Sequence, residues 1–157
     1  MSTWSRTPHT FVASETPTAA SFNSLPGGVI AYANSAADVT GIAGTEIEVL
    51  NTGALTVPAN TLLTVTINLY LEVDTAGVLA AVFLRESAAT LHVFHEYFAA
   101  SGGGGHRTPT LIWTFPAAST TPTYSVGVYR ENPTTGSATI IAKSGSQITV
   151  RDEGPTS

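Results

Sequence analysis

The sequence predicts an all-β protein: an antiparallel β-sandwich of jelly-roll type with a short N-terminal arm that carries one short helix. Two observations predict this fold class. Residues 62–73 alternate between apolar and polar side chains, which is typical of a half-buried strand. From residue 29 onward, short apolar runs follow one another between Gly- and Pro-rich turns, without the spacing of a βαβ unit.

The stretch 62–73 has the clearest alternation in the chain. One parity carries aliphatic side chains, namely Leu63, Val65, Ile67, Leu69, Leu71 and Val73. From residue 64 onward, the positions between them carry neutral polar side chains, up to the charged Glu72. A neutral face rich in hydroxyls suits burial against another chain better than ordinary exposure to solvent. We therefore predict a subunit interface formed by Thr64, Thr66, Asn68 and Tyr70.

Further strands are expected wherever apolar and β-branched residues gather between turn signals. The tight turn at 74–77 favours a hairpin, and a helix is the competing interpretation for 78–87. The expected strands are Val29–Ala33, Thr45–Leu50, Ala54–Val57, Leu62–Val73, Val78–Glu86, Ala89–Phe98, Thr110–Phe115, Thr123–Arg130, Ala138–Lys143 and Gln147–Arg151.

The first 28 residues differ from the rest and are predicted to form a docking arm. Thr16 fits a helix N-cap and Pro17 the first helical position, so residues 16–23 predict one short helix. Such a helix is too short to be stable alone and must dock on something. Its expected apolar anchors are Trp4, Phe11 and Phe22. The sandwich is expected over 29–152, followed by a polar tail over 153–157.

The composition excludes several classes of protein. Hydrophobic residues make up 43% of the 157 residues and charged residues 11%, a balance that argues against disorder. The net charge is −5 and the six basic residues are scattered, so we expect no nucleic-acid partner. There is no cysteine, which excludes disulfides and thiolate metal sites. No signal-peptide core or membrane-spanning run is visible, so we expect no membrane insertion.

The four histidines do not predict a metal or acid–base site. His92 and His95 lie three positions apart in an expected strand, so their side chains leave opposite faces and cannot chelate one metal ion. His9 lies in the arm. His106 and Arg107 follow four glycines, but the Lys-Ser/Thr and helix N-terminus of a phosphate loop are missing. We predict a hairpin tip there, with His106 and Arg107 as candidate ligand contacts.

The carboxylates and hydroxyls do not predict catalysis. Glu46 and Glu48 share one strand face, and Glu72 lies two positions before Asp74, but no Asp-rich calcium loop is present. No Gly-x-Ser-x-Gly segment or other nucleophile motif occurs. We therefore predict a protein that is not an enzyme, with no catalytic residue, metal or cofactor.

The strand expected over 89–98 is partly apolar on both faces. Phe94 and Phe98 share one face with His92 and Glu96, and the other face carries Leu91, Val93 and Tyr97. Aromatic residues usually fill a core. One face of this strand is thus expected in the core, and the other is a further candidate for a subunit contact.

Segments at both ends of the chain resemble virion proteins of tailed bacteriophages. Residues 10–23, T-F-V-A-S-E-T-P-T-A-A-S-F-N, are similar to the segment T-(W/F)-V-A-G-E-x-x-T-A-A-x-L-N near the N-terminus of phage tail and virion proteins. They depart from it at Ser14, Pro17 and Phe22. Residues 25–33 and 44–48 resemble the start of small β-rich proteins of phages that infect actinobacteria. Residues 148–155 resemble their C-termini, with Glu153 in place of an apolar residue.

The resemblance implies a non-enzymatic virion structural protein, made in the host cytoplasm and released by lysis. The first hypothesis is that the protein is a minor tail component, at the tail tip or in a fibre, which is attached through the arm and contributes to host attachment. The alternative is a capsid decoration or head-fibre protein. Related sandwiches are commonly trimeric, so the expected partners are two further copies and other virion proteins. A carbohydrate- or receptor-binding module, with a host cell-surface glycan as partner, is a second alternative.

Overall fold

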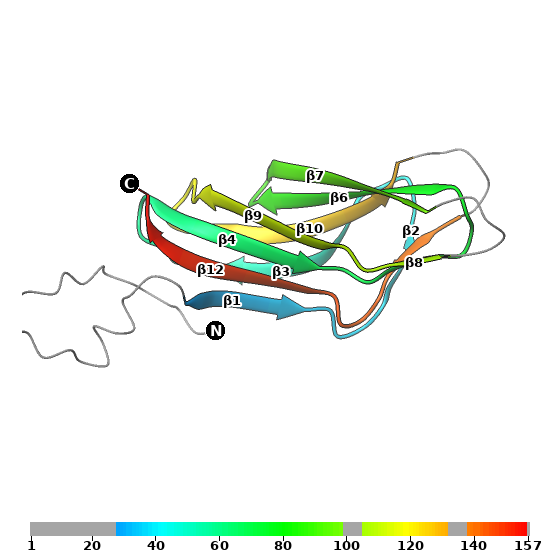
Figure 1. Ribbon diagram of the computed structural model, residues 1–157, viewed down its shortest axis with the longest axis horizontal. Coiled ribbons are helices and arrows are strands. Elements are labelled where there is room, and N and C mark those ends of the chain that lie inside the picture. Colours follow the sequence, from blue (N-terminus) through cyan, green and yellow to red (C-terminus); the bar gives the residue numbers. More distant parts are fainter. Residues whose placement is uncertain (1–27, 99–104, 132–137, 157) are drawn as a thin grey trace, which may run out of the picture.

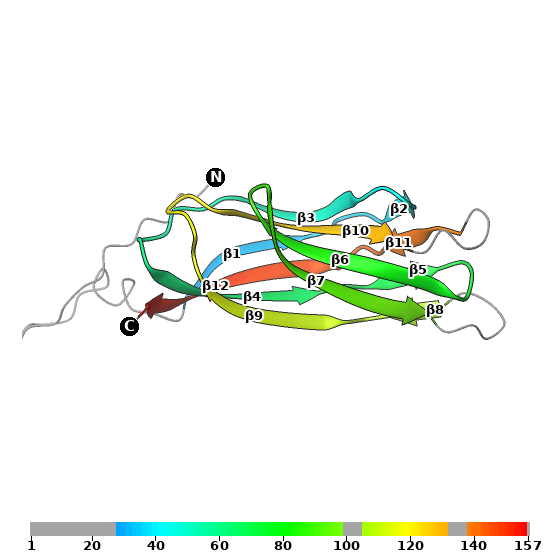
Figure 2. The same cartoon turned by 90° about the horizontal axis from the view of Figure 1, so that it is seen from above.

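The computed structural model describes residues 28–98, 105–131 and 138–156. Within these ranges it contains twelve strands and no helix, arranged as two packed layers (Figures 1 and 2). The predicted all-β sandwich is confirmed. The predicted helix over 16–23 and the arm anchors Trp4, Phe11 and Phe22 lie outside the described residues.

The first layer is a long antiparallel sheet that bends partway along its strands. Its larger part has the order β1-β12-β4-β9, with the bounds Val29–Asn34, Gln147–Pro155, Thr61–Asn68 and Thr110–Pro116. Beyond the bend the same order is repeated by β2-β11-β5-β8, with the bounds Val39–Ile42, Ile140–Ala142, Leu71–Val73 and Gly105–Arg107. Two consecutive strands therefore form one continuous run of the chain through this layer, which we call a pass. The four passes are β1 with β2, β4 with β5, β8 with β9, and β11 with β12.

The second layer is a single antiparallel sheet that covers the first. Its order is β3-β10-β6-β7, with the bounds Ile47–Ala54, Thr123–Arg130, Val78–Glu86 and Ala89–Phe98. The layers approach each other at both edges, where β1 contacts β3 and β7 contacts β8. Figure 2 shows the four strands of this layer running along the length of the sandwich.

The core lies between the layers and follows the alternation seen in the sequence. The aliphatic parity of 62–73 is completely buried, at 0–1% exposure for all six side chains. Neighbouring strands continue these inward rows, because Ile67 pairs with Ile148 and with Leu111, and Val65 pairs with Val150 and with Trp113. The predicted inward face of this segment is thus confirmed.

The strand predicted over 62–73 is divided in two by the bend. Strand β4 ends at Asn68 and β5 begins at Leu71, although the inward and outward parity continues through both. The turn after β5 does not form the predicted hairpin: β5 belongs to the first layer and β6 to the second, so the chain crosses between layers. Residues 78–86 form a strand, and the competing helix is wrong.

The turn signal at residues 51–53 lies inside a strand. Strand β3 runs through it to Ala54, where Gly53 has a φ of +70° and its N–H donates to the Asn51 side chain at 2.7 Å. The pairing of β3 with β10 is irregular there, so this segment is a bulge and does not separate two strands. At the other end of the chain, β12 extends to Pro155, past the expected end of the sandwich at 152.

The inward and outward sides of β4 should respond differently to truncation. We expect Ile67→Ala to lower the free energy of unfolding by about 2–5 kcal/mol, because it opens a cavity at a fully buried site. The neighbouring Thr66→Ala, on the outer side, should change it by about 0.5 kcal/mol or less. Urea denaturation of both variants measures the difference, and equal losses would contradict this assignment of faces.

Candidate functional site

A pocket of about 410 Å³ lies on the first layer at its bend. It is lined from three passes of the chain: Tyr70 and Leu71 come from the junction of β4 and β5, and the others come from β8 and its junction with β9 and from the junction of β11 with β12. These others are His106, Arg107, Thr108, Lys143, Ser144 and Gly145. The pocket thus brings together Tyr70, predicted at a subunit interface, with His106 and Arg107, predicted at a loop tip.

Backbone and hydroxyl hydrogen bonds hold the bend in place. The Lys143 N–H donates to the Tyr70 carbonyl at 2.8 Å, and the Tyr70 N–H donates to the Ser146 hydroxyl at 3.0 Å. The same hydroxyl donates to the Lys143 carbonyl at 2.8 Å. The side chain of Ser146 is completely buried, so this short bridge replaces ladder bonds where the strands bend. Tyr70 is therefore fixed at its backbone while its side chain reaches the surface.

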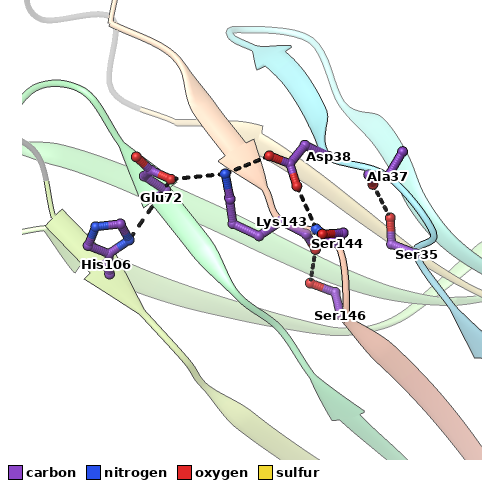
Figure 3. A network of polar contacts seen from close by, with 8 residues as sticks. All are labelled: Ser35, Ala37, Asp38, Glu72, His106, Lys143, Ser144 and Ser146. Atoms are coloured by element: carbon purple, nitrogen blue, oxygen red, sulfur yellow. Dashed lines mark hydrogen bonds and ion pairs between the residues drawn. The ribbon is translucent and has the colours of Figure 1, made fainter.

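A row of three charged side chains and one histidine, which we call the charged row, crosses the layer beside the pocket (Figure 3). The Lys143 ammonium lies 2.5 Å from an Asp38 carboxylate oxygen and 3.3 Å from a Glu72 oxygen. Beyond Glu72, His106 Nδ1 lies 4.0 Å from the same Glu72 oxygen, and its side chain is 76% exposed. Each of the four passes in the first layer thus contributes one member of this row.

The charges in this row compensate one another. The hydrogen bond from Lys143, together with one from the Ser144 N–H at 2.8 Å, holds the pKa of Asp38 below its ordinary range. In return, hydrogen bonds to Asp38 and then to Glu72 raise the pKa of Lys143. At neutral pH one cation therefore faces two carboxylates, and the row does not present a free positive charge to solvent.

Arg107 is engaged within the fold. Its Nε donates to a Glu96 carboxylate oxygen at 3.0 Å, and its guanidinium lies 5.7 Å from the centre of the Phe98 ring. Both partners belong to β7, so Arg107 joins the two layers at their edge. His106 and Arg107 lie on strand β8, and the tip predicted at the preceding glycines falls mostly outside the described residues.

The outer face of the first layer is almost free of charge over β4 and β9. The predicted interface residues Thr64, Thr66 and Asn68 lie together on it, whereas Tyr70 lies at the bend. Polar side chains of this face bond to each other across the strands. Thr64 and Thr114 hydroxyls are 2.8 Å apart, and the Thr110 hydroxyl donates to the side-chain amide oxygen (Oδ1) of Asn68 at 2.7 Å.

Two large exposed side chains flank this polar centre. Register places Tyr32, Thr149, Thr66 and Ile112 in one row across β1, β12, β4 and β9. Tyr32 is 57% exposed and Ile112 is 62% exposed. We call the uncharged part of this exposed side the neutral face, defined by Tyr32, Thr149, Thr64, Thr66, Asn68, Thr110, Ile112 and Thr114. At its border lie two charged residues of β12, Arg151, which is opposite Thr64, and Glu153, whose carboxylate is 4.0 Å from Arg151 Nε.

The outer face of the second layer is different in character. Phe83 and Tyr129 stack there with ring centres 5.4 Å apart, and Val93 and Tyr97 are about half exposed. Arg85 forms a two-pronged ion pair with Glu46, whose side chain lies over Gly127. A hydrogen bond from Arg85 lowers the pKa of Glu46. Strand β7 thus has the two partly apolar faces that the sequence predicted.

The two other histidines of the described ranges, His92 and His95, have structural partners. The His92 ring stacks on Trp113 with ring centres 4.9 Å apart and an angle of 1° between the planes. His95 Nε2 lies 3.2 Å from a Glu131 oxygen. Among the described residues, no three His, Asp or Glu side chains gather so as to hold a metal ion. These residues also include no helix with the length and apolar character of a membrane span.

Sequence reasoning missed Asp38, Lys143, Ser144 and Gly145, which complete the charged row or the pocket. No spacing pattern links them to Tyr70, because they come from different passes of the chain. The feature of the sequence that could have pointed to Asp38 and Lys143 is that charged residues are rare in this chain. In a chain with 17 Lys, Arg, Asp and Glu residues, each charged residue placed inside a strand-rich segment invites a search for its partner.

Comparisons with known proteins return distant structural likenesses. No known family matches the chain, and no curated protein matches it. The insecticidal delta-endotoxin Cry8Ea1 of Bacillus thuringiensis matches 73% of this chain at 10% identity and a TM-score of 0.41, and the match spans 19% of that protein. A CBM4 structure matches 78% of this chain and 95% of its own length at 11% identity and a TM-score of 0.35. With scores and identities this low, neither likeness assigns a function.

The ion pair of Asp38 should contribute to acid sensitivity. Its pKa is lowered in the folded state, so its stabilising effect is present above the ordinary pKa, about 3.9, and is lost as pH falls through the lowered value. We expect the free energy of unfolding to fall on acidification below about pH 4. Asp38→Asn should make that fall smaller.

Urea denaturation over a pH series measures this effect. The matched control is Glu48→Gln, which removes a carboxylate that accepts a hydrogen bond from the Asn51 amide. The control should follow the wild-type pH profile more closely than Asp38→Asn does. An Asp38→Asn profile parallel to that of the wild type would show that the row contributes nothing to acid sensitivity.

Proposed function

We propose that this protein is a non-enzymatic virion structural protein that associates with copies of itself through the neutral face. The observation that supports this most is the internal bonding of that face. Hydroxyl and amide groups of β4 and β9 bond to each other across the strands, at Thr64 with Thr114 and at Thr110 with Asn68. A surface of this kind can be covered by another chain without leaving these groups unpaired.

The energetics of burial favour this face as a contact. An unsatisfied buried polar group costs about 1–3 kcal/mol, and an unpaired buried charge costs more. Groups that already bond to a neighbour avoid most of that loss. Tyr32 and Ile112, which flank the polar centre, add apolar area whose removal from water stabilises a complex by about 25 cal/mol per Å².

The charge distribution favours a second copy as the occupant. The chain carries a net charge of −5, so two copies repel each other through most of their surfaces. The neutral face itself carries no charge, and Arg151 and Glu153 at its border have opposite signs, so a contact centred on this face limits the repulsion between like charges. A trimer, the state expected from the resemblance to phage proteins, would repeat this contact around one axis.

The strand order supports the finer description of the fold as a jelly roll. If each continuous pass of the chain through a layer is counted as one strand, the sandwich has eight strands. In the first layer their order is first, eighth, third and sixth, and in the second layer it is second, seventh, fourth and fifth. Jelly rolls are double sheets of eight strands built from two Greek keys. A jelly roll is also the type of sandwich that the sequence predicts.

The segments that carry the phage resemblance also meet in space. Residues 29–33, near the start of the sandwich, form most of β1, and residues 148–155 form most of β12. These strands pair directly, with Ala33 opposite Ile148 and Ala31 opposite Val150. These two parts of the resemblance thus lie side by side in the first layer, whereas residues 47 and 48 begin β3 of the second layer and residues 10–23 lie outside the described residues. A minor tail component remains the first placement, and a capsid decoration or head-fibre protein the alternative.

Self-association through the neutral face can be tested with one charge on each side of the sandwich. We expect the wild type to be oligomeric at low concentration and Thr66→Glu to be monomeric, because it would bury an unpaired charge at a cost of about 3–5 kcal/mol. The matched control, Val93→Glu on the outer face of the second layer, should stay oligomeric. Light scattering after size exclusion measures the mass. A monomeric wild type, or dissociation caused by Val93→Glu and not by Thr66→Glu, would overturn the proposal.

The virion role can be tested on purified particles of the virus that encodes the chain. We expect quantitative mass spectrometry to find the protein in the particle, with few copies for a tail position and many for capsid decoration. A variant that lacks residues 1–25 should keep a folded sandwich, shown by its circular dichroism, but be lost from the particle. Absence of the wild type from particles would refute the virion role, and full incorporation of the variant would refute docking through the arm.

A further inference from the structure

We propose that the pocket at the bend binds a neutral saccharide unit, with the Tyr70 ring as the surface on which the sugar stacks. This site is separate from the neutral face, and its function does not depend on self-association. Its volume of about 410 Å³ lies within the range of about 300–1,000 Å³ that small-molecule sites occupy. The argument rests on the aromatic ring, its rigid support and the charge balance around it.

Tyr70 has the properties of a binding platform. The residue is 43% exposed, although its neighbours Leu69 and Leu71 are completely buried. A tyrosine ring offers an apolar face and a polar hydroxyl at its tip, and a pyranose offers an apolar C–H face edged by hydroxyls. An exposed ring at the wall of a pocket is thus matched to a sugar better than to a flexible aliphatic ligand.

The platform is fixed before any ligand arrives. The Tyr70 N–H and carbonyl are both bonded, to the Ser146 hydroxyl and the Lys143 N–H. Beside the ring lies Gly145, with a φ of +87°, where a Cβ would lie 3.8 Å from Tyr70 Cε2. The glycine permits the left-handed turn and adds no side chain beside the ring. A preorganised site loses less conformational entropy on binding.

The charged row favours a neutral ligand over an ion. Lys143 is already shared by Asp38 and Glu72, so an anion would have to compete with two carboxylates for one ammonium. A free cation would compete with that ammonium for the carboxylates. Arg107 is likewise paired with Glu96. Paired groups of this kind still offer fixed donors and acceptors, which suit hydroxyls because each hydroxyl can both donate and accept.

His106 supplies a further polar group at the rim of the pocket. The His106 side chain is 76% exposed and lies beside Glu72, which is opposite it in the pairing of β8 with β5. Tyr70 directly precedes β5. A sugar stacked on Tyr70 therefore meets hydrogen-bonding groups of His106 and Lys143, which both line the pocket. The expected affinity is that of a small, open site, with a Kd of about 1 mM.

Nuclear magnetic resonance of the uniformly ¹⁵N-labelled full-length protein tests the site. The probes are the methyl glycosides of glucose, galactose, mannose and N-acetylglucosamine, with methyl glucuronide and inorganic phosphate as anionic comparisons. We expect at least one neutral glycoside to shift the amides of Tyr70, Thr108, Ser144 and Gly145 in a saturable way. Shifts by the anions alone, or no saturable shift with any glycoside, would overturn the proposal.

Three variants connect binding to the platform. Tyr70→Ala should weaken binding about tenfold, which corresponds to the loss of one stacking contact. Tyr32→Ala removes an exposed tyrosine from the neutral face and should leave the affinity unchanged. His106→Ala, at a highly exposed side chain, should weaken binding by a smaller factor and keeps the test open if Tyr70→Ala fails to fold. Unchanged affinity in both pocket variants would overturn the proposal. The mass of the Thr66→Glu protein tests self-association separately.

Discussion

The pairing of β12 between β1 and β4 is the constraint on which the first layer depends. Strand β12 bonds to both neighbours along most of its length, and its Ile148 and Val150 are completely buried. Without it, β1 has no partner in the layer and β4 has an open edge. The inward rows that fill the core, such as Ala33, Ile148, Ile67 and Leu111, exist only because β12 joins their two halves.

The pocket and the neutral face both lie on the first layer. Over β1, β12, β4 and β9 the strands remain paired, and most of their outward side chains form the neutral face. Where the passes bend, Ser146 substitutes for ladder bonds, and the side chain of Tyr70 stands beside a hollow. Charge is concentrated at the bend in Asp38, Lys143, Glu72 and His106. The molecule thus separates the neutral face, which we propose contacts a second copy, from the pocket, which we propose binds a sugar.

Period-two alternation predicted the fold class, the inward face of 62–73 and the grouping of Thr64, Thr66 and Asn68, because alternation is a local property of the backbone. It could not predict the bend, since the Tyr70 N–H is held by a serine 76 positions away. The charged row escaped prediction for the same reason. Arg107 was expected at a loop tip because the glycine run before it suggested one; the structure pairs it with Glu96 on β7 instead.

The order of strands along the chain has a consequence for synthesis. Strand β12 is the last strand of the sandwich to be translated, yet it occupies an interior position of the first layer. Contacts between segments so distant in sequence form late and slowly in folding. A nascent chain still lacking β12 also lacks Thr149 and the continuous surface around it. The topology therefore completes the neutral face only after translation has passed β12, so an unfinished chain cannot present it.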